Sequence, residues 1–120
     1  MATQEELHEK LMSATGEDRI SCLLDYAFSF HTKDPEKALN LIQEAESLSL
    51  KHSCLEDLGR CHQMYSVYWG VKGNYDKALE SALESLSLAQ KTGRRDNACG
   101  LYNNLAIIYS RLKEHEKMQD

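Results

Sequence analysis

The feature that most constrains the fold of this 120-residue chain is an internal repeat with a period of 40 residues. The segment 35–39 (PEKAL) returns as 75–79 (YDKAL), and residues 44–50 align with 84–90 in the same register. A further shift by 40 residues aligns 115–118 (HEKM) with the start of the second copy. Repeats of roughly 20–50 residues are typical of chains built from stacked copies of one supersecondary unit. The sequence therefore predicts three related units, the third of them incomplete.

Each unit is predicted to be a pair of helices, because apolar residues recur every three or four positions and helix start signals precede them. The segments 3–6 (TQEE) and 53–56 (SCLE) have the form of capping boxes. Asp34 before Pro35 combines a capping side chain with a residue that suits the first helical position. Asn74 and Gly93 bracket a further helix in the same way. We predict seven helices in all. The third spans 35–51, the fifth 75–92 and the sixth about 95–113, and the seventh starts at Glu114.

Composition excludes several classes of protein. The formal net charge is −5, from 14 Lys and Arg against 19 Asp and Glu, whereas a nucleic-acid-binding module usually presents a basic surface. No apolar run is long enough for a transmembrane helix, and the acidic start at 1–6 is unlike a signal peptide. We therefore expect a cytoplasmic protein without nucleic-acid or membrane partners, in which the four cysteines stay reduced.

The repeats resemble those of the tetratricopeptide repeat family, in which aromatic residues surround a small residue on the first helix of each pair. Residues 102–109 (YNNLAIIY) match this half of the family pattern closely. The period of 40 residues exceeds the usual period of about 34 and resembles the long-repeat type. The corresponding positions are His62, Tyr65, Ser66 and Trp69 in the middle unit, and Leu23, Tyr26, Ala27 and Phe30 in the first.

The resemblance implies an all-α fold: a right-handed array of about two and a half helical hairpins after an N-terminal helix. One domain would span 1–120, divided into the helix at 1–16, repeats at 17–52 and 53–93, and a truncated repeat at 94–120. The resemblance also implies that the chain is the N-terminal region of a larger bacterial signalling protein. Its expected function is non-catalytic: it binds a partner protein or peptide, or senses a signal, and needs no cofactor.

The resemblance also places the partner-binding residues, because the first helix of each pair lines a concave groove in this family. Asn103 and Asn104 before Leu105 and Ala106 resemble a long-repeat segment in which an Asn grips a ligand backbone, as an amide can donate and accept. Two arginines on these helices favour an acidic or backbone-presenting ligand. The predicted partner-binding residues are Arg60, Gln63, Met64, Val67, Asn103, Asn104, Ile107 and Arg111, with Leu24, Phe28, His31 and Val71 beside them.

The main alternative function is self-association. Leu101, Leu105, Ile108 and Leu112 form an apolar stripe on the last complete helix, and the sequence holds no following helix to cover it. Such a stripe would favour a weak homodimer through the C-terminal helix.

A further alternative is a metal- or redox-responsive switch. His52, Cys54, Cys61 and His62 have suitable side chains but lack the close cysteine spacing of structural zinc sites, so we predict packing cysteines and no metal site. No glycine-rich phosphate loop occurs, and no motif arranges a nucleophile with a base, so no catalytic residue is predicted.

Overall fold

The computed structural model describes the backbone at 3–93 and 96–119, and the side chains at 3–93 and 102–114. Within these ranges the chain is all-α, as predicted, and contains no strand. The six helices are α1 (Gln4–Ser13), α2 (Gly16–Ser29), α3 (Pro35–Lys51), α4 (Leu55–Val71), α5 (Tyr75–Thr92) and α6 (Asp96–Gln119).

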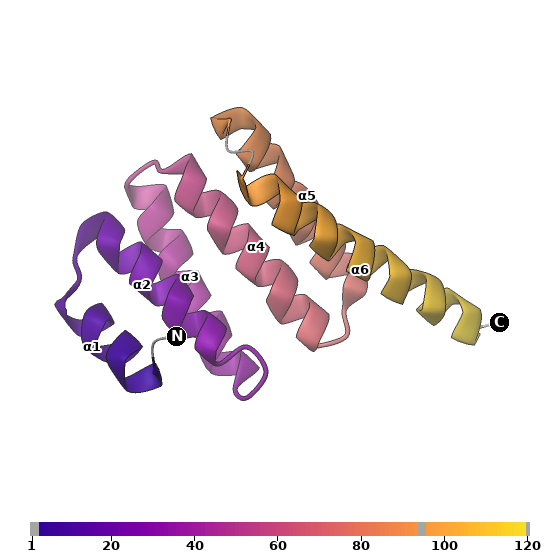
Figure 1. Ribbon diagram of the computed structural model, residues 1–120, viewed down its shortest axis with the longest axis horizontal. Coiled ribbons are helices and arrows are strands. Elements are labelled where there is room, and N and C mark those ends of the chain that lie inside the picture. The colour runs from indigo at the N-terminus through magenta and orange to yellow at the C-terminus, as the bar shows by residue number, and fades with distance from the viewer. Residues whose placement is uncertain (1–2, 94–95, 120) are drawn as a thin grey trace.

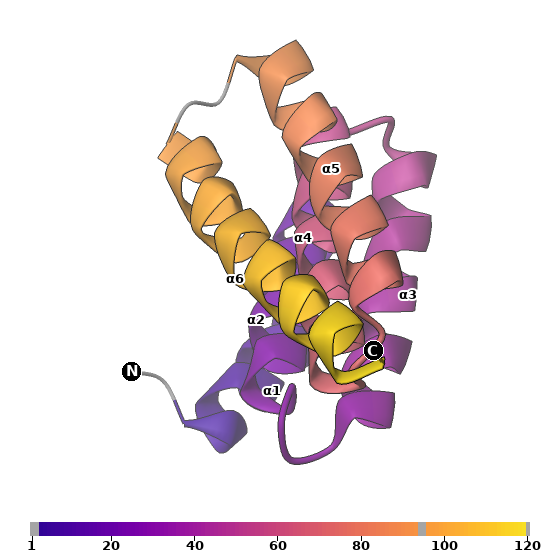
Figure 2. The same ribbon diagram turned by 90° about the vertical axis from the view of Figure 1, so that its right-hand side faces the viewer.

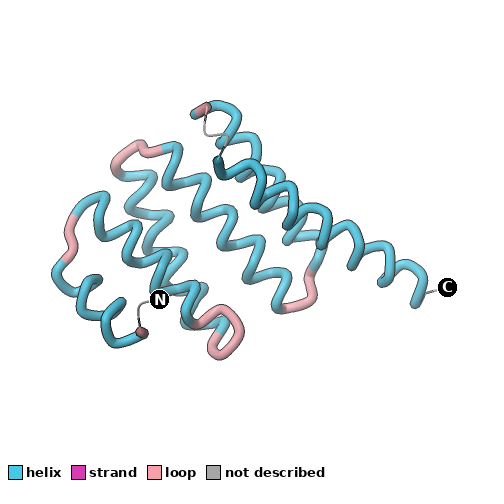
Figure 3. Tube along the Cα trace, viewed as in Figure 1, coloured by secondary structure: helices cyan, strands magenta, loops and turns pink. Residues whose placement is uncertain are grey.

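Consecutive helices run antiparallel and pack side by side in chain order, so that each helix contacts the one before it and the one after it (Figures 1 and 3). The described connections are short, for example 52–54 and 72–74. Helix α2 also contacts α4, which brings the first helices of two successive pairs together. Figure 2 looks along this row from its C-terminal end, with α6 in front.

Most of the predicted helix starts are confirmed by hydrogen bonds that backbone amides donate to the capping side chains. The Glu6 amide donates to Thr3 Oγ1 at 3.2 Å, and the Lys37 amide donates to Asp34 Oδ1 at 3.2 Å. The Lys77 amide donates to Asn74 Oδ1 at 3.3 Å. Each bond satisfies an amide that has no partner within its helix, so these local sequence signals set the helix boundaries.

The predicted capping box at Ser53 is wrong. Ser53 has a φ of +54°, in the left-handed region, and Cys54 takes the N-cap position of α4 without a side-chain cap. The Cys54 amide donates to the Ser49 carbonyl at 3.0 Å, and the Ser53 amide donates to the Leu50 carbonyl at 3.2 Å. Ser53 therefore closes the C-terminus of α3 in a Schellman motif, a place usually taken by glycine, and is not available to start α4.

The predicted break before a seventh helix is also wrong, because α6 continues without interruption from Asp96 to Gln119. In the preceding unit the chain turns at Gly73, which has a φ of +80°, and restarts at Asn74. A shift of 40 residues places Lys113 and Glu114 at these two positions. Lys and Glu both favour the helix interior, so nothing local stops the helix there.

The larger hydrophobic cluster joins α1, α2, α3 and α4. Ala27 on α2 is fully buried, as are Ala38 and Ala45 on α3, and these small side chains let the two helices approach closely. Cys61 and Tyr68 of α4 complete the cluster.

A smaller cluster joins α4, α5 and α6, and Trp69 of α4 packs against both clusters. Leu105 and Ile108 of α6 are 7% and 6% exposed and pack with Ala78 and Ala82 of α5. The apolar stripe of α6 was predicted to lack a partner, but α5 covers the part of it whose side chains are described. Leu101 lies outside the described side chains. The self-association prediction loses this stripe as its basis.

Candidate functional site

The first helices of the successive pairs line a groove with a volume of about 740 Å³. Most of its lining residues lie on α2 and α4, and α1 and α6 contribute one residue each. None of its described lining residues belongs to α3 or α5, as expected if the first helix of each pair lines the groove. The lining residues are Leu7, Leu24, Asp25, Phe28, Ser29, His31, Arg60, Gln63, Met64, Val67 and Asn104.

Helix α1 contributes Leu7 to the lining of this groove, which the sequence did not predict. The Gln4 side-chain amide donates to the Ser29 carbonyl at 3.2 Å, and Arg19 Nη1 donates to the Leu11 carbonyl at 3.1 Å. Leu11 is buried, so α1 is fixed on α2 by both apolar packing and hydrogen bonds. Periodicity predicts such a helix but not the face of α2 on which it docks.

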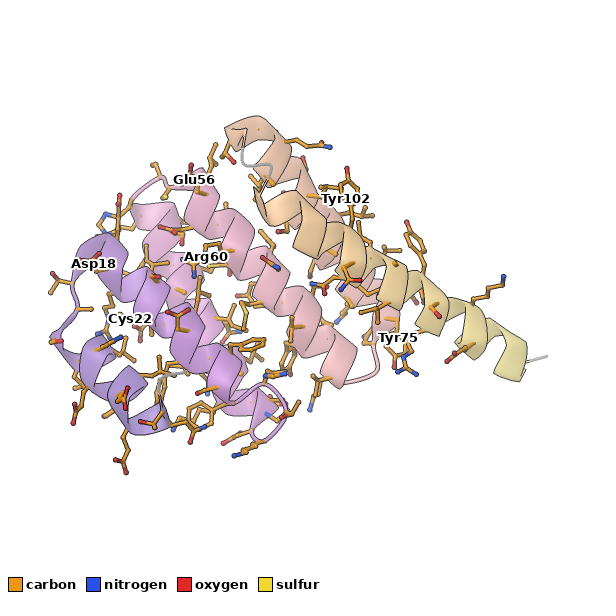
Figure 4. The ribbon with its side chains drawn as sticks, viewed as in Figure 1. Asp18, Cys22, Glu56, Arg60, Tyr75 and Tyr102 are labelled. Atoms are coloured by element: carbon orange, nitrogen blue, oxygen red, sulfur yellow. The ribbon has the colours of Figure 1, made fainter. Side chains whose placement is uncertain are left out.

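Arg60 connects the two long walls of the groove. Its Nη1 donates to Ser21 Oγ at 3.3 Å, and its Nη2 lies 3.8 Å from Asp25 Oδ1 on α2. Asp57, one turn earlier on α4, lies 3.9 Å from Nη1. Figure 4 shows Arg60 on α4, facing α2. Two carboxylates thus balance its charge, and the groove offers no strong attraction to an acidic ligand.

The lining of the groove combines apolar side chains with side chains that can form hydrogen bonds. Phe28 is 46% exposed, and its ring stacks on that of His31 with centroids 4.4 Å apart. Met64 and Val67 are half-buried beside it. Gln63 and Asn104 add two side-chain amides, which can each donate to and accept from a peptide backbone. The groove can therefore hold apolar side chains and pair with the main chain that carries them.

Three of the predicted partner-binding residues lie away from this groove. Asn103 is exposed and is not among the lining residues. Ile107 and Arg111 line a separate, shallower depression of about 390 Å³, where Arg111 Nη1 lies 3.6 Å from a Glu114 carboxylate oxygen. Val71 is 41% exposed and also lies outside the groove. Helical spacing places Asn104, Ile107 and Arg111 on one side of α6, but it does not show how much of that side borders the groove.

The candidate metal ligands are not gathered into one site. Within the described side chains, no three His, Cys, Asp or Glu residues come together in a metal-binding arrangement. Cys61 is fully buried between α3 and α4, where its Sγ lies 3.7 Å from Ser49 Oγ. Burial raises the pKa of its thiol to about 11, because the thiolate loses its hydration. Cys61 therefore stays protonated near neutral pH, which disfavours both metal binding and redox chemistry.

Comparison with known protein families, curated proteins and solved structures finds no significant match to this chain. In the described part of the chain, no helix is both long and apolar enough to cross a membrane.

Proposed function

We propose that this protein is a non-catalytic interaction module that binds an extended segment of a partner protein in the groove between α2 and α4. The observation that carries the proposal is the groove itself, with its exposed Phe28, its flexible Met64 and its two amide side chains. Exposed apolar surface rimmed by polar groups is typical of protein-binding sites. The tetratricopeptide resemblance, a cytoplasmic location and a place in a signalling protein belong to the same proposal.

The chemistry of the groove supports a binding function rather than a catalytic one. Ser29 and His31 are the lining residues that could pair as nucleophile and base. The Ser29 hydroxyl donates to the Tyr26 carbonyl at 2.6 Å, and His31 Nδ1 bonds the Phe28 carbonyl at 2.6 Å. Each is thus engaged with the local backbone, and a nucleophile needs its base directly beside it.

The charge of the groove favours a backbone-presenting ligand over an acidic one, because Arg60 is already paired with Asp25 and Asp57. A segment with one or two apolar side chains spaced along an extended backbone fits this surface best. The apolar groups would cover Phe28 and Met64, and Gln63 and Asn104 would bond the main chain.

Selection from a library of random peptides displayed on phage tests this proposal. We expect the protein to enrich peptides that lose binding to Val67→Asp, which places a charge in the groove. The control variant is Leu83→Asp, since Leu83 is 44% exposed on α5 and does not line the groove. Peptides that bind wild type and both variants equally, or no enrichment at all, would refute the groove as the binding site.

A further inference from the structure

We propose that a second surface, the face of α6 formed by Tyr102, Ala106 and Tyr109, docks an amphipathic helix that carries a Lys–Ala pair in its first turn. Tyr102 and Tyr109 are 56% and 53% exposed, and Ala106 between them is exposed as well. Tyr102 is marked on α6 in Figure 4. Asn104, which lines the groove, lies about 200° around the helix from Ala106, so the two surfaces are independent.

The corresponding face of each earlier unit is covered by the helix that follows it. In α2 this face contains Ala27, which is fully buried against α3. In α4 it contains Ser66, which is 3% exposed, and Trp69, which packs against Ala78 and Ala82 of α5. The same register positions recur in α6, so a helix that covers them would continue the packing already present between α2 and α3 and between α4 and α5.

Both covering helices recognise an aromatic ring by the same contact. Lys37 Nζ lies 4.3 Å from the centroid of the Phe30 ring, and Lys77 Nζ lies 4.4 Å from the centroid of Trp69. Each Lys is the third residue of its helix and precedes a fully buried alanine. Tyr109 holds the position of Phe30 and Trp69 in α6, and its ring is exposed. The negative face of this ring is therefore free to attract a cation.

The occupant follows from these contacts. A Lys in the first turn reaches the Tyr109 ring, and the alanine after it fits against Ala106, where neither side chain obstructs close approach. Positions four and seven after that alanine should be small or apolar, as Ala82 and Ser85 are in α5. A helix that covers Tyr102 and Tyr109 also buries the apolar area of these two large side chains.

The test uses the chain of residues 1–120 and a fluorescein-labelled synthetic peptide with the sequence of residues 74–92, which includes α5 and its cap. We expect saturable binding by fluorescence polarisation. Tyr109→Ala should weaken it about tenfold, because the ring and its cation contact are lost. In the peptide, Lys77→Met should weaken binding about threefold, whereas Lys77→Arg should retain it. The control is Leu83→Ala in the peptide. It changes a residue that is exposed in α5, and this peptide should bind as the unchanged peptide does.

Ala106→Arg is a second variant, because it places a long side chain in the middle of the face at an exposed position. It should abolish binding while the circular dichroism of α-helix stays unchanged. Absence of saturable binding would overturn the proposal. Binding that both variants leave unchanged would overturn it too, since the peptide would then be displacing α5. A concentration-dependent dimer that Ala106→Arg dissociates, without peptide binding, would assign the face to a second copy instead.

Discussion

The hydroxyl of Ser85 on α5 donates a 2.7 Å hydrogen bond to the backbone carbonyl of Gly59 on α4, and both residues are buried. A Cβ atom built on Gly59 would lie 3.5 Å from Leu88 Cβ, which is an ordinary van der Waals contact. The two helices are therefore close enough for a side chain to reach the neighbouring backbone, yet they leave room for one methyl group.

Substitutions at Gly59 should consequently raise or lower the free energy of unfolding according to the size of the new side chain. Gly59→Ala is expected to raise the free energy of unfolding by about 0.5–1 kcal/mol, because alanine favours the helix and its methyl group fits. Gly59→Leu is expected to lower it by about 1–3 kcal/mol through overpacking against Leu88. Urea unfolding followed by circular dichroism measures both. A loss of stability in the alanine variant would show that α4 and α5 are closer than the structure indicates.

Ser53→Gly should stabilise the protein, because Ser53 occupies a left-handed conformation that glycine adopts without strain. The expected gain is about 0.5–1 kcal/mol after the greater flexibility of unfolded glycine is taken into account. The matched control is Ser47→Gly, at an exposed helical position of α3, which should cost about 0.5 kcal/mol. Thermal unfolding of both variants compares them, and a melting temperature that falls in both would contradict the assigned backbone geometry.

The correction at Ser53 shows where a local sequence signal becomes ambiguous. Caps at Thr3, Asp34 and Asn74 are local, since each side chain bonds an amide three residues later, and sequence alone predicts them. Ser53 could cap the following helix or close the preceding one. The choice depends on how tightly α3 turns into α4, which is a tertiary property.

Tertiary packing also explains the mixed outcome at the groove. Apart from Val71, the residues grouped on α2 and α4 line one groove, because the repeat register places them on the same face of neighbouring helices. Leu7 was missed, since no pattern in α1 shows where it docks. Ile107 and Arg111 line a different depression from Asn104, because helical spacing does not show how far the groove extends along α6.

Stability should fall between about pH 9 and pH 11 because of Cys61. Its thiol has a pKa of about 11 in the folded protein, raised by burial from an ordinary value of 9.0. Below pH 9 the Cys61 thiol is protonated in both the folded and the unfolded protein. As the pH rises further, the unfolded chain ionises first, so unfolding becomes more favourable by on the order of 1–3 kcal/mol. Denaturant unfolding across this range should show a steeper loss for wild type than for Cys61→Ala. Parallel pH profiles in the two proteins would exclude this origin.

Asn104→Ala should weaken groove binding by about 1–3 kcal/mol, because backbone groups of the ligand would lose their partner. It should leave the fold intact, since Asn104 is only half-buried. Its neighbour Asn103 is exposed and does not line the groove, so Asn103→Ala is the matched control. Titration of a phage-selected peptide by calorimetry compares the two variants. Equal losses of affinity would show that the peptide contacts α6 outside the groove.

The division of the core into two unequal clusters has a consequence for the order in which the molecule opens. Among the described residues, the cluster of α1 to α4 contains many of the most deeply buried side chains, such as Ile20 and Ile42. In the smaller cluster, the buried residues of α6 are Leu105 and Ile108, and Leu112 is only partly buried. Local opening costs least where few apolar contacts are broken. Backbone amides of α6 should therefore exchange with deuterium earliest among α2 to α6, followed by those of α5, and amides of α3 should exchange last. The only tryptophan of the chain, Trp69, packs against both clusters, so its fluorescence would report this fraying before the rest of the protein unfolds.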